Sequence, residues 1–266
     1  MAEVAGRNTV LKISGDAVAM TGEATTEDVT TKIYQITDTA KQVLDRTATI
    51  RVHVQGAGET AEDGTTETNI EITGHGLVAG DLIINKTHAG ARLVIAKVDA
   101  NNITVAAITG MTNGDTIETY KTQDSSTYTL NRLSGKATFA TASSRVVKIS
   151  GSYLPMTTAA YAHNATSNRA ADVVDVTAYG DTHKKRAVTL LSASGSLSQF
   201  DITDTTYSDA LSAGVPVVLE LSEDGVVEPT RYWVLLESDE VTAAIDGVQD
   251  KTVSWVSYDT WLRLGV

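Results

Sequence analysis

The sequence contains no cysteine, only three prolines and few aromatic residues, which make up 5% of the chain. The absence of cysteine excludes a disulfide-stabilised scaffold, a thiolate metal site and a cysteine nucleophile. It also fits a protein made in a reducing cytoplasm. The low aromatic content argues against a surface built for stacking on sugars.

Basic residues are scarce beside acidic ones, with 21 lysines and arginines against 33 aspartates and glutamates and a net charge of −12. A protein this acidic repels nucleic-acid phosphates and does not wrap DNA, although DNA can pass it without being held. No run of 18 apolar residues occurs, so we expect no membrane-spanning segment. The first residues have neither the basic nor the apolar region of a secretory signal, so we expect none.

Threonine is abundant, with 39 copies in 266 residues. Its β-branched side chain favours half-buried strands, so the composition predicts a mainly β protein. A hydrophobic fraction of 42% excludes a disordered acidic chain. The length allows one large β domain or two smaller ones.

An internal repeat links the two halves of the chain. Residues 11–21 read LKISGDAVAMT and residues 147–157 read VKISGSYLPMT, so six of the eleven positions are identical. Two copies separated by half the chain are too few and too distant for a solenoid or a propeller. The repeat predicts two related β units in tandem; the alternative is coincidence on a common strand-and-turn pattern.

Alternating apolar and polar residues between turn signals predict a series of strands. The predicted strands are 9–20, 32–37, 47–55, 126–131, 136–140, 145–154, 172–179, 187–199, 215–221, 230–240 and 251–258. One helix is predicted at 204–213, where Asp204 can cap the first turn and Gly214 can end the last. Its inner face would carry Tyr207, Ala210 and Leu211, and a helix this short needs a sheet to pack against.

The middle of the chain differs in composition. Residues 58–69 are polar, acidic and glycine-bearing, and a compact glycine-punctuated β pattern follows up to residue 120. We interpret 58–123 as a small β domain inserted into a loop, because insertions at exposed loop tips cost the host little. Its nine acidic and four basic residues exclude a basic docking patch.

No convincing active site is visible, so we predict no enzyme, no cofactor and no metal site. The glycines of residues 74–80 lack the strand and helix of a phosphate loop and are interpreted as turn positions. The histidines have no metal-binding spacing, and no G-x-S-x-G elbow occurs. The run 183–186, HKKR, is interpreted as a solvated turn in preference to a phosphate site.

The last residues of the chain are apolar and aromatic, with Trp255, Tyr258, Trp261, Leu262 and Leu264 close together. Chain ends usually fray unless they dock. The pattern therefore predicts docking, either on the protein's own core or on a neighbouring subunit, and leaves these two alternatives open.

Two strings in the second half resemble a known family. Residues 175–182, DVTAYGDT, are similar to a stretch of the major tail proteins of long-tailed phages with non-contractile tails, and 192–200, SASGSLSQF, resemble the strand that follows it. Residues 128–139 resemble a hairpin of other phage tail proteins, and 73–81 with 98–105 resemble small β modules of phage structural proteins. The likeness covers about residues 145–258.

The resemblance implies a tail-tube fold, a β-sandwich closing toward a barrel with one short flanking helix, plus the small inserted β domain. The tube core would be 1–57 and 124–266, in which a hairpin at 124–144 joins a partial first copy to the main copy 145–258. Residues 58–123 would face outward, because they would block a lumen.

The resemblance also implies a structural virion protein of the tail. Its subunits would form rings, usually hexameric, that stack into a tube, hold the tape-measure protein, meet tail terminator and baseplate or tip proteins, and let DNA pass without binding it. Two barrel walls per chain would instead allow three subunits with pseudo-sixfold symmetry. The first half has no counterpart of the helix, which favours six.

The segment 155–169 is rich in Ala, Thr and Asn, and we interpret it as a long loop that contacts the next ring or is an ordinary surface loop. The candidate subunit contacts are Pro155, Met156, Tyr161, His163, Arg169, Trp261, Leu262 and Leu264. An alternative function is a monomeric β adhesion or carbohydrate-binding module. A β-rich hydrolase has no motif in its favour.

Overall fold

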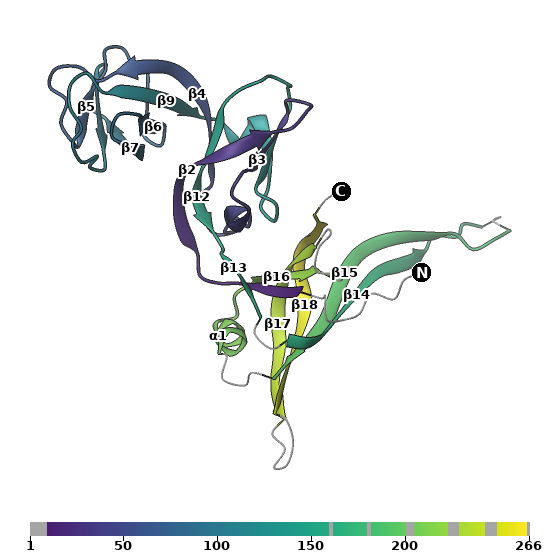
Figure 1. Ribbon diagram of the computed structural model, residues 1–266. Helices are drawn as coiled ribbons and strands as arrows, with labels where there is room; N and C mark the ends of the chain where they lie inside the picture. Colours follow the sequence, from purple (N-terminus) through teal and green to yellow (C-terminus); the bar gives the residue numbers. More distant parts are fainter. Residues whose placement is uncertain are drawn as a thin grey trace. The chain divides into compact units, whose positions relative to one another are not determined.

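The computed structural model describes residues 10–159, 162–179, 182–200, 205–222, 229–242 and 249–264. Within these ranges the protein is mainly β, with antiparallel pairing and one short α-helix, which confirms the expected fold class (Figure 1). The chain forms two compact units. Unit 1 comprises Met1–Gly15 and Met156–Val266, and unit 2 comprises Asp16–Pro155.

Unit 1 is built on a seven-stranded sheet in the order β13-β1-β16-β17-β18-β15-β14. Its strands are β1 (Val10–Ser14), β13 (Met156–Thr158), β14 (Ala162–Asp175), β15 (Arg186–Gln199), β16 (Val217–Ser222), β17 (Thr230–Thr242) and β18 (Asp250–Arg263). The order places the two strands of the long β14–β15 hairpin at one end, so β14 is an edge strand.

Strand β16 lies near the middle of this sheet, and all six of its side chains are buried. Alternation predicts one apolar face, formed by Val217, Leu219 and Leu221, and these residues do belong to the core of unit 1. The other face is covered as well and carries Glu220. Salt bridges of 2.7 Å to Lys12 and to Arg231 hold this buried carboxylate in place.

The predicted helix is confirmed as α1 (Thr206–Ala213), although its proposed cap, Asp204, lies outside the described residues. Gly214 ends it in the left-handed conformation, with φ at 62°, where a side chain would be strained. Tyr207 is fully buried in the core of unit 1, and Ala210 and Leu211 pack against the same core. None of the helices in the described ranges is long and apolar enough to cross a membrane.

Unit 2 contains eleven strands in the order β10-β11-β3-β2-β12-β4-β9-β6-β7-β8-β5. They are β2 (Val18–Glu27), β3 (Ile33–Ile36), β4 (Arg51–Thr60), β5 (Asn69–Glu71), β6 (Leu82–Asn85), β7 (Gly90–Lys97), β8 (Asn102–Val105), β9 (Thr116–Thr122), β10 (Tyr128–Asn131), β11 (Lys136–Phe139) and β12 (Val147–Tyr153). Two single 3₁₀ turns accompany them, at Thr39–Lys41 and Ser125–Thr127.

Two separate hydrophobic clusters lie inside unit 2. One draws all its buried residues from between Ala61 and Ile117, and the other combines residues from β2, β3, β4, β11 and β12. The expected boundaries of the inserted domain, 58 and 123, therefore fall within unit 2 and around the first cluster. Strand β4 runs across the first boundary and pairs with both β12 and β9, and the insertion stays a prediction.

The sequence repeat lies where the chain passes between the units. The first copy ends β1 in unit 1 and begins β2 in unit 2, and the second copy forms β12 in unit 2 and begins β13 in unit 1. The halves pair crosswise: β1 lies antiparallel to β13, and β2 lies antiparallel to β12. The two copies therefore do not begin two tandem units, because each copy contributes to one strand in unit 1 and one strand in unit 2.

Three predictions along the chain need correction. The strand predicted at 172–179 ends at Asp175, because β14 stops there and residues 176–179 belong to the connection toward β15. The segment predicted as one strand, 9–20, is interrupted between Ser14 and Val18. The interpretation of 155–169 as a loop is also wrong, because β13 and most of β14 occupy its described residues. Periodicity failed there because the side chains of β14 are exposed on both faces or small, so backbone pairing with β15 defines the strand without an apolar alternation.

Candidate assembly surface

The β14–β15 hairpin extends away from the rest of the unit 1 sheet (Figure 1). Its register runs from the Ala162–Gln199 pair at the base to the Asp175–Arg186 pair near the tip. Strand β18 pairs with β15 only from Ser194 to Gln199. Beyond Ser194 the hairpin is therefore two strands wide.

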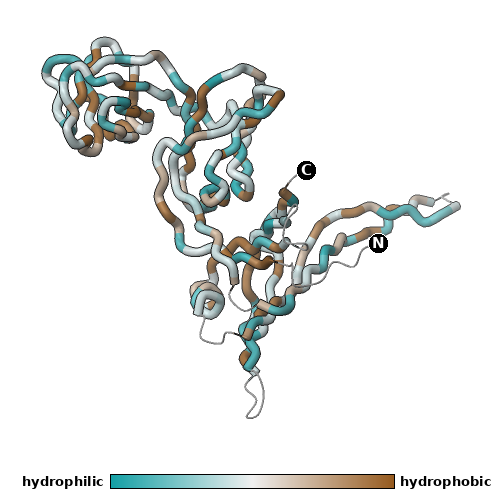
Figure 2. The backbone as a smooth tube through the Cα atoms, in the orientation of Figure 1, coloured by the Kyte–Doolittle hydropathy of each residue, from teal (hydrophilic) through white to brown (hydrophobic). Residues whose placement is uncertain are grey.

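Hydrophobic residues recur along this two-stranded part of the chain (Figure 2). Successive side chains in a strand point to opposite faces, yet Val173 and Val174 are both about half exposed, at 54% and 45%. Leu190 and Leu191 of β15 are even more exposed, at 69% and 64%. An isolated two-stranded hairpin is marginal in water, so this arm presents apolar area that the chain itself does not bury.

Part of the string DVTAYGDT forms a hydrogen-bonded turn at the tip of the hairpin. The Asp175 carboxylate accepts a hydrogen bond from the Thr177 amide at 2.9 Å and another from the Thr177 hydroxyl, and these bonds lower the pKa of Asp175. The Thr177 hydroxyl oxygen in turn accepts from the Lys185 amide at 3.0 Å. Tyr179 projects from this turn and is fully exposed.

In the second string, SASGSLSQF, the structure accounts for the glycine, Gly195. A Cβ at this position would collide with the Thr166 carbonyl oxygen of β14 and lie 2.6 Å from the Trp255 ring. Trp255 is buried in the core of unit 1. Glycine therefore lets β14, β15 and the indole of β18 approach one another at the base of the hairpin.

Two predicted contact residues, Arg169 and His163, lie on β14 and already have partners in unit 1. Arg169 donates from Nε to the Tyr232 hydroxyl at 3.0 Å and from Nη2 to the Thr230 hydroxyl at 3.3 Å. The His163 ring stacks on Phe200 with 3.9 Å between ring centroids. Both side chains therefore anchor the base of the hairpin, and their role in subunit contacts stays a prediction.

The other predicted contacts are scattered. Pro155 is the last residue of unit 2, half-buried, and Met156 is the half-buried first residue of β13, opposite Ser14. Tyr161 lies outside the described residues. Leu262 and Leu264 are half-buried at the end of the chain, and the Leu264 amide donates to the Pro229 carbonyl at 2.9 Å.

Trp261 packs against the core of unit 1, with its ring centroid 6.3 Å from that of Tyr232. Of the two alternatives for the aromatic end of the chain, the described residues thus show docking on the protein's own unit. A subunit contact by the exposed part of this segment stays a prediction.

A groove lies beside Trp261. In β18, Trp261 pairs with Tyr232 but Ser257 pairs with Val234, so a bulge of three residues stands opposite Trp233. The groove has a volume of about 470 Å³. It is lined by Leu191 of β15 and by Ser257, Tyr258, Asp259, Thr260 and Trp261 of β18. The sequence placed Tyr258 and Trp261 near each other, but only the bulge and the pairing with β15 make a groove of them.

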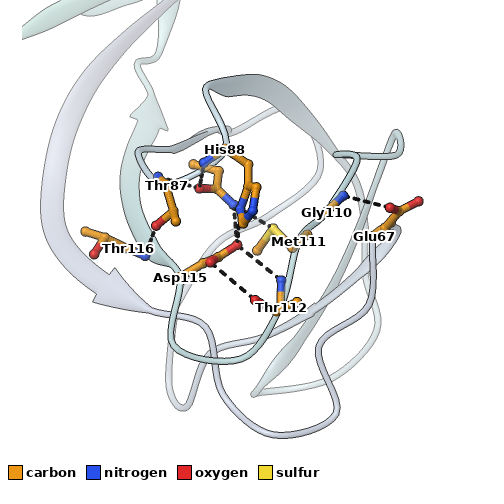
Figure 3. Close-up of polar contacts among 9 residues, drawn as sticks. Glu67, Thr87, His88, Gly110, Met111, Thr112, Asp115 and Thr116 are labelled. Carbon is orange, nitrogen blue, oxygen red and sulfur yellow. Dashed lines mark hydrogen bonds and ion pairs between the residues drawn. The ribbon is translucent and has the colours of Figure 1, made fainter.

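A polar cluster surrounds the buried Asp115 in unit 2 (Figure 3). Its Oδ2 atom accepts from Asn85 at 2.8 Å, lies 2.9 Å from His88 Nδ1 and accepts from the Thr112 amide at 3.2 Å. Burial opposes ionisation of Asp115, but these bonds outweigh it and lower its pKa. The partners come from the end of β6 and from the turns that follow β6 and precede β9, so the cluster holds these segments of unit 2 together.

The remaining histidines of unit 2 also serve the fold. His53 is fully buried between the hydroxyls of Ser150 and Thr122, each 3.0 Å from a ring nitrogen, and burial lowers its pKa to about 4. His75 accepts from the Leu77 amide at 2.8 Å inside the 74–80 turn. Among the described residues no group of three or more histidine, aspartate or glutamate side chains is placed to hold a metal ion.

No family model matches the sequence, and no curated protein matches it. Among solved structures, a chain in the virion of a native gene transfer agent (GTA) particle is similar to 41% of this chain and 89% of its own length, with 15% identity and a TM-score of 0.37. A chain in the tail of an empty GTA particle with C6 symmetry is similar to 42% of this chain and 87% of its own, with 14% identity and a TM-score of 0.38. Both likenesses leave more than half of this chain unmatched and do not assign it a family.

Proposed function

We propose that this chain is a structural subunit of a phage-type tail that assembles with copies of itself into stacked rings, and that the stacked rings form a tube. In this proposal six subunits close a ring, the tube holds a tape-measure protein, and DNA later passes through without being bound. Tail terminator and tip proteins would close its ends. The matched strings 175–182 and 192–200 support this role.

The observation that carries the proposal is the uncovered β14–β15 hairpin. Val173, Val174, Leu190 and Leu191 leave apolar area on both faces, and exposed apolar patches mark interaction sites. A stable monomer would gain from burying this area or from replacing it with polar side chains. A second copy of the chain supplies a surface that is present wherever the protein itself is made.

The edge of β14 supports the same conclusion. Natural edge strands are usually short or are protected by lysine, proline or a bulge that turns them away. Strand β14 is 14 residues long and contains neither lysine nor proline, and between two register irregularities its pairing with β15 is unbroken from Asn164 to Ala171. A strand of a neighbouring subunit would satisfy its outer backbone groups, and strand addition that continues around a ring removes the edge.

The direct test is electron microscopy of the purified protein in negative stain, over a concentration series and alongside sedimentation velocity. We expect rings or tubes at high concentration, with six-fold views along the axis. A species that stays monomeric at every concentration would contradict the proposal. Sugar binding by that monomer would instead favour the adhesion or carbohydrate-binding alternative.

A further inference from the structure

The tip of the β14–β15 hairpin has a chemistry that differs from the rest of the chain. The protein carries a net charge of −12, yet residues 183–186 read HKKR and are all exposed. Beside this basic run stands Tyr179, fully exposed, with Val176 half exposed. The tip therefore combines an aromatic anchor with positive charge, a combination that favours an acidic, partly apolar partner surface.

The groove beside Trp261 offers the complementary chemistry. Its apolar walls are Leu191, Tyr258 and Trp261, and its charged lining residue is the carboxylate Asp259. Tyrosine and tryptophan gain from offset or edge-to-face aromatic neighbours in addition to burial, so these walls favour an aromatic side chain. At about 470 Å³ the groove is large enough to admit a tyrosine side chain.

The tip cannot reach the groove of its own copy. Leu191, which lines the groove, is five residues after Arg186 along the same strand, and the hairpin pairing continues out to the Asp175–Arg186 pair. Five residues of extended strand span about 16 Å, and the tip continues beyond them. The tip that fills a groove must therefore come from another molecule.

We infer that Tyr179 of one copy inserts into the groove formed by Leu191, Tyr258 and Trp261 of a second copy, with Lys184 beside Asp259. The contact joins two different surfaces of the same chain. Made head-to-tail it propagates as a ring or a tube, whereas a reciprocal exchange of tips between two copies closes as a two-fold dimer. This inference rests on the proposed self-assembly and names the surfaces that carry it.

Because the sequence contains no cysteine, every disulfide in a cross-linking test must form between introduced cysteines. Two single variants, Tyr179→Cys and Asp259→Cys, are mixed under assembly conditions and oxidised, and the products are separated on a non-reducing gel. A disulfide needs Cα atoms about 4.4–6.8 Å apart. We expect a reducible species of two chains in the mixture and a ladder of longer reducible species in the double variant, but little in either single variant alone.

The matched control pairs Tyr179→Cys with Val29→Cys, because Val29 of unit 2 is as fully exposed as Tyr179. No enrichment of the two-chain species is expected in this mixture. If the unmodified protein forms rings or tubes and the Tyr179–Asp259 mixture still shows no more cross-linking than the control, the docking is wrong while self-assembly stands. If the unmodified protein never assembles, both proposals fail.

A charge exchange provides a second, independent readout. Lys184→Glu and Asp259→Lys should each raise the concentration at half-assembly at least tenfold, and the double variant should regain most of the loss. Lys97→Glu, an exposed lysine of β7, is the control and should leave assembly unchanged. Failure of the double variant to recover, or quenching of Trp261 fluorescence by free sugars in place of assembly, would overturn the inference.

Discussion

The Asp115 cluster and the β14–β15 hairpin differ in whether the monomer itself buries their side chains. The cluster encloses a charge, and the partners that satisfy it, including Asn85 and His88, come from nearby turns of the same chain. The hairpin leaves Leu190 and Leu191 mostly exposed to water, at 69% and 64%. The first region is complete in the monomer, whereas the second gains its packing only when another molecule arrives.

This difference predicts whether a mutation changes the free energy of unfolding or the assembly of the protein. A change in an enclosed polar cluster should lower the free energy of unfolding and leave the assembly surface intact. A change in the hairpin should weaken assembly and leave the free energy of unfolding nearly unchanged. The variants below are ordered from the largest expected effect on unfolding to the smallest.

Glu220→Gln is expected to have the largest effect. The buried Glu220 carboxylate is paired with Lys12 and Arg231, and breaking a buried ion pair by removing one charge costs about 3–5 kcal/mol. Urea unfolding followed by tryptophan fluorescence should register the loss, because the tryptophans lie in unit 1. The control Glu237→Gln changes an exposed carboxylate of the neighbouring strand and should cost less than about 0.5 kcal/mol.

Acid should weaken unit 2 through His53. Burial lowers the pKa of His53 in the folded state to about 4, against an ordinary value of 6.5. The unfolded chain therefore binds the proton first, so the stabilisation is complete above pH 6.5 and is lost as the pH falls toward 4. The loss is roughly 3 kcal/mol. Hydrogen exchange of peptides from residues 16–155 should follow this pH range, and His53→Gln should flatten the dependence.

Asp115→Ala should cost about 1–3 kcal/mol, because it leaves the Asn85 amide and its neighbours without their buried acceptor. Faster hydrogen exchange in residues 82–120 is the expected signature, with ring or tube formation retained at 25 °C. Asp63→Ala, at an exposed turn, is the matched control and should behave like the unmodified protein. Loss of assembly in Asp115→Ala without any change in exchange would contradict the division between the two regions.

The hairpin pair Leu190→Ser with Leu191→Ser should change the free energy of unfolding by less than about 0.5 kcal/mol, because both side chains are exposed in the monomer. Assembly should nevertheless require at least tenfold more protein, as measured by sedimentation. The exposed residues Val78→Ser and Val98→Ser of unit 2 are the control. Equal loss of assembly in both pairs would remove the special role of the hairpin.

Removing residues 59–117, most of the inserted domain predicted at 58–123, should leave assembly intact. Gly58 and Glu118 are partners in the β4–β9 register, so a two-residue turn can replace the residues between them. The shortened chain should still form rings or tubes in negative stain. Failure to fold, seen as lost tryptophan burial in unit 1, would mean that this segment is part of the core.

Sequence patterns worked best where a strand is covered on one face or a helix has clear ends. Gly214 and the spacing of Tyr207, Ala210 and Leu211 predicted α1 correctly. The patterns failed at β14, because small exposed side chains give no periodicity even where the backbone pairs with β15. They also failed to show that β16 is covered on both faces, since Glu220 resembles a solvent-facing residue until Lys12 and Arg231 are placed beside it.

Sequence patterns predicted only part of the candidate assembly surface, for a similar reason. The aromatic residues near the chain end drew attention to Trp261, and the basic run 183–186 was recognised as a turn. Neither signal reveals a groove, because the bulge between Ser257 and Trp261 and the neighbouring Leu191 exist only once β18 pairs with β17 and β15.

By itself the sequence determined the class of this protein: a cysteine-free, acidic, threonine-rich chain can form a mainly β fold without disulfides or thiolate metal sites, because local propensity and charge act residue by residue. The tertiary structure alone decided which strands of the repeat join which unit, which charges are enclosed and which apolar side chains are left uncovered. Those outcomes depend on pairing between residues far apart in the chain, and no local pattern encodes the partner of a strand.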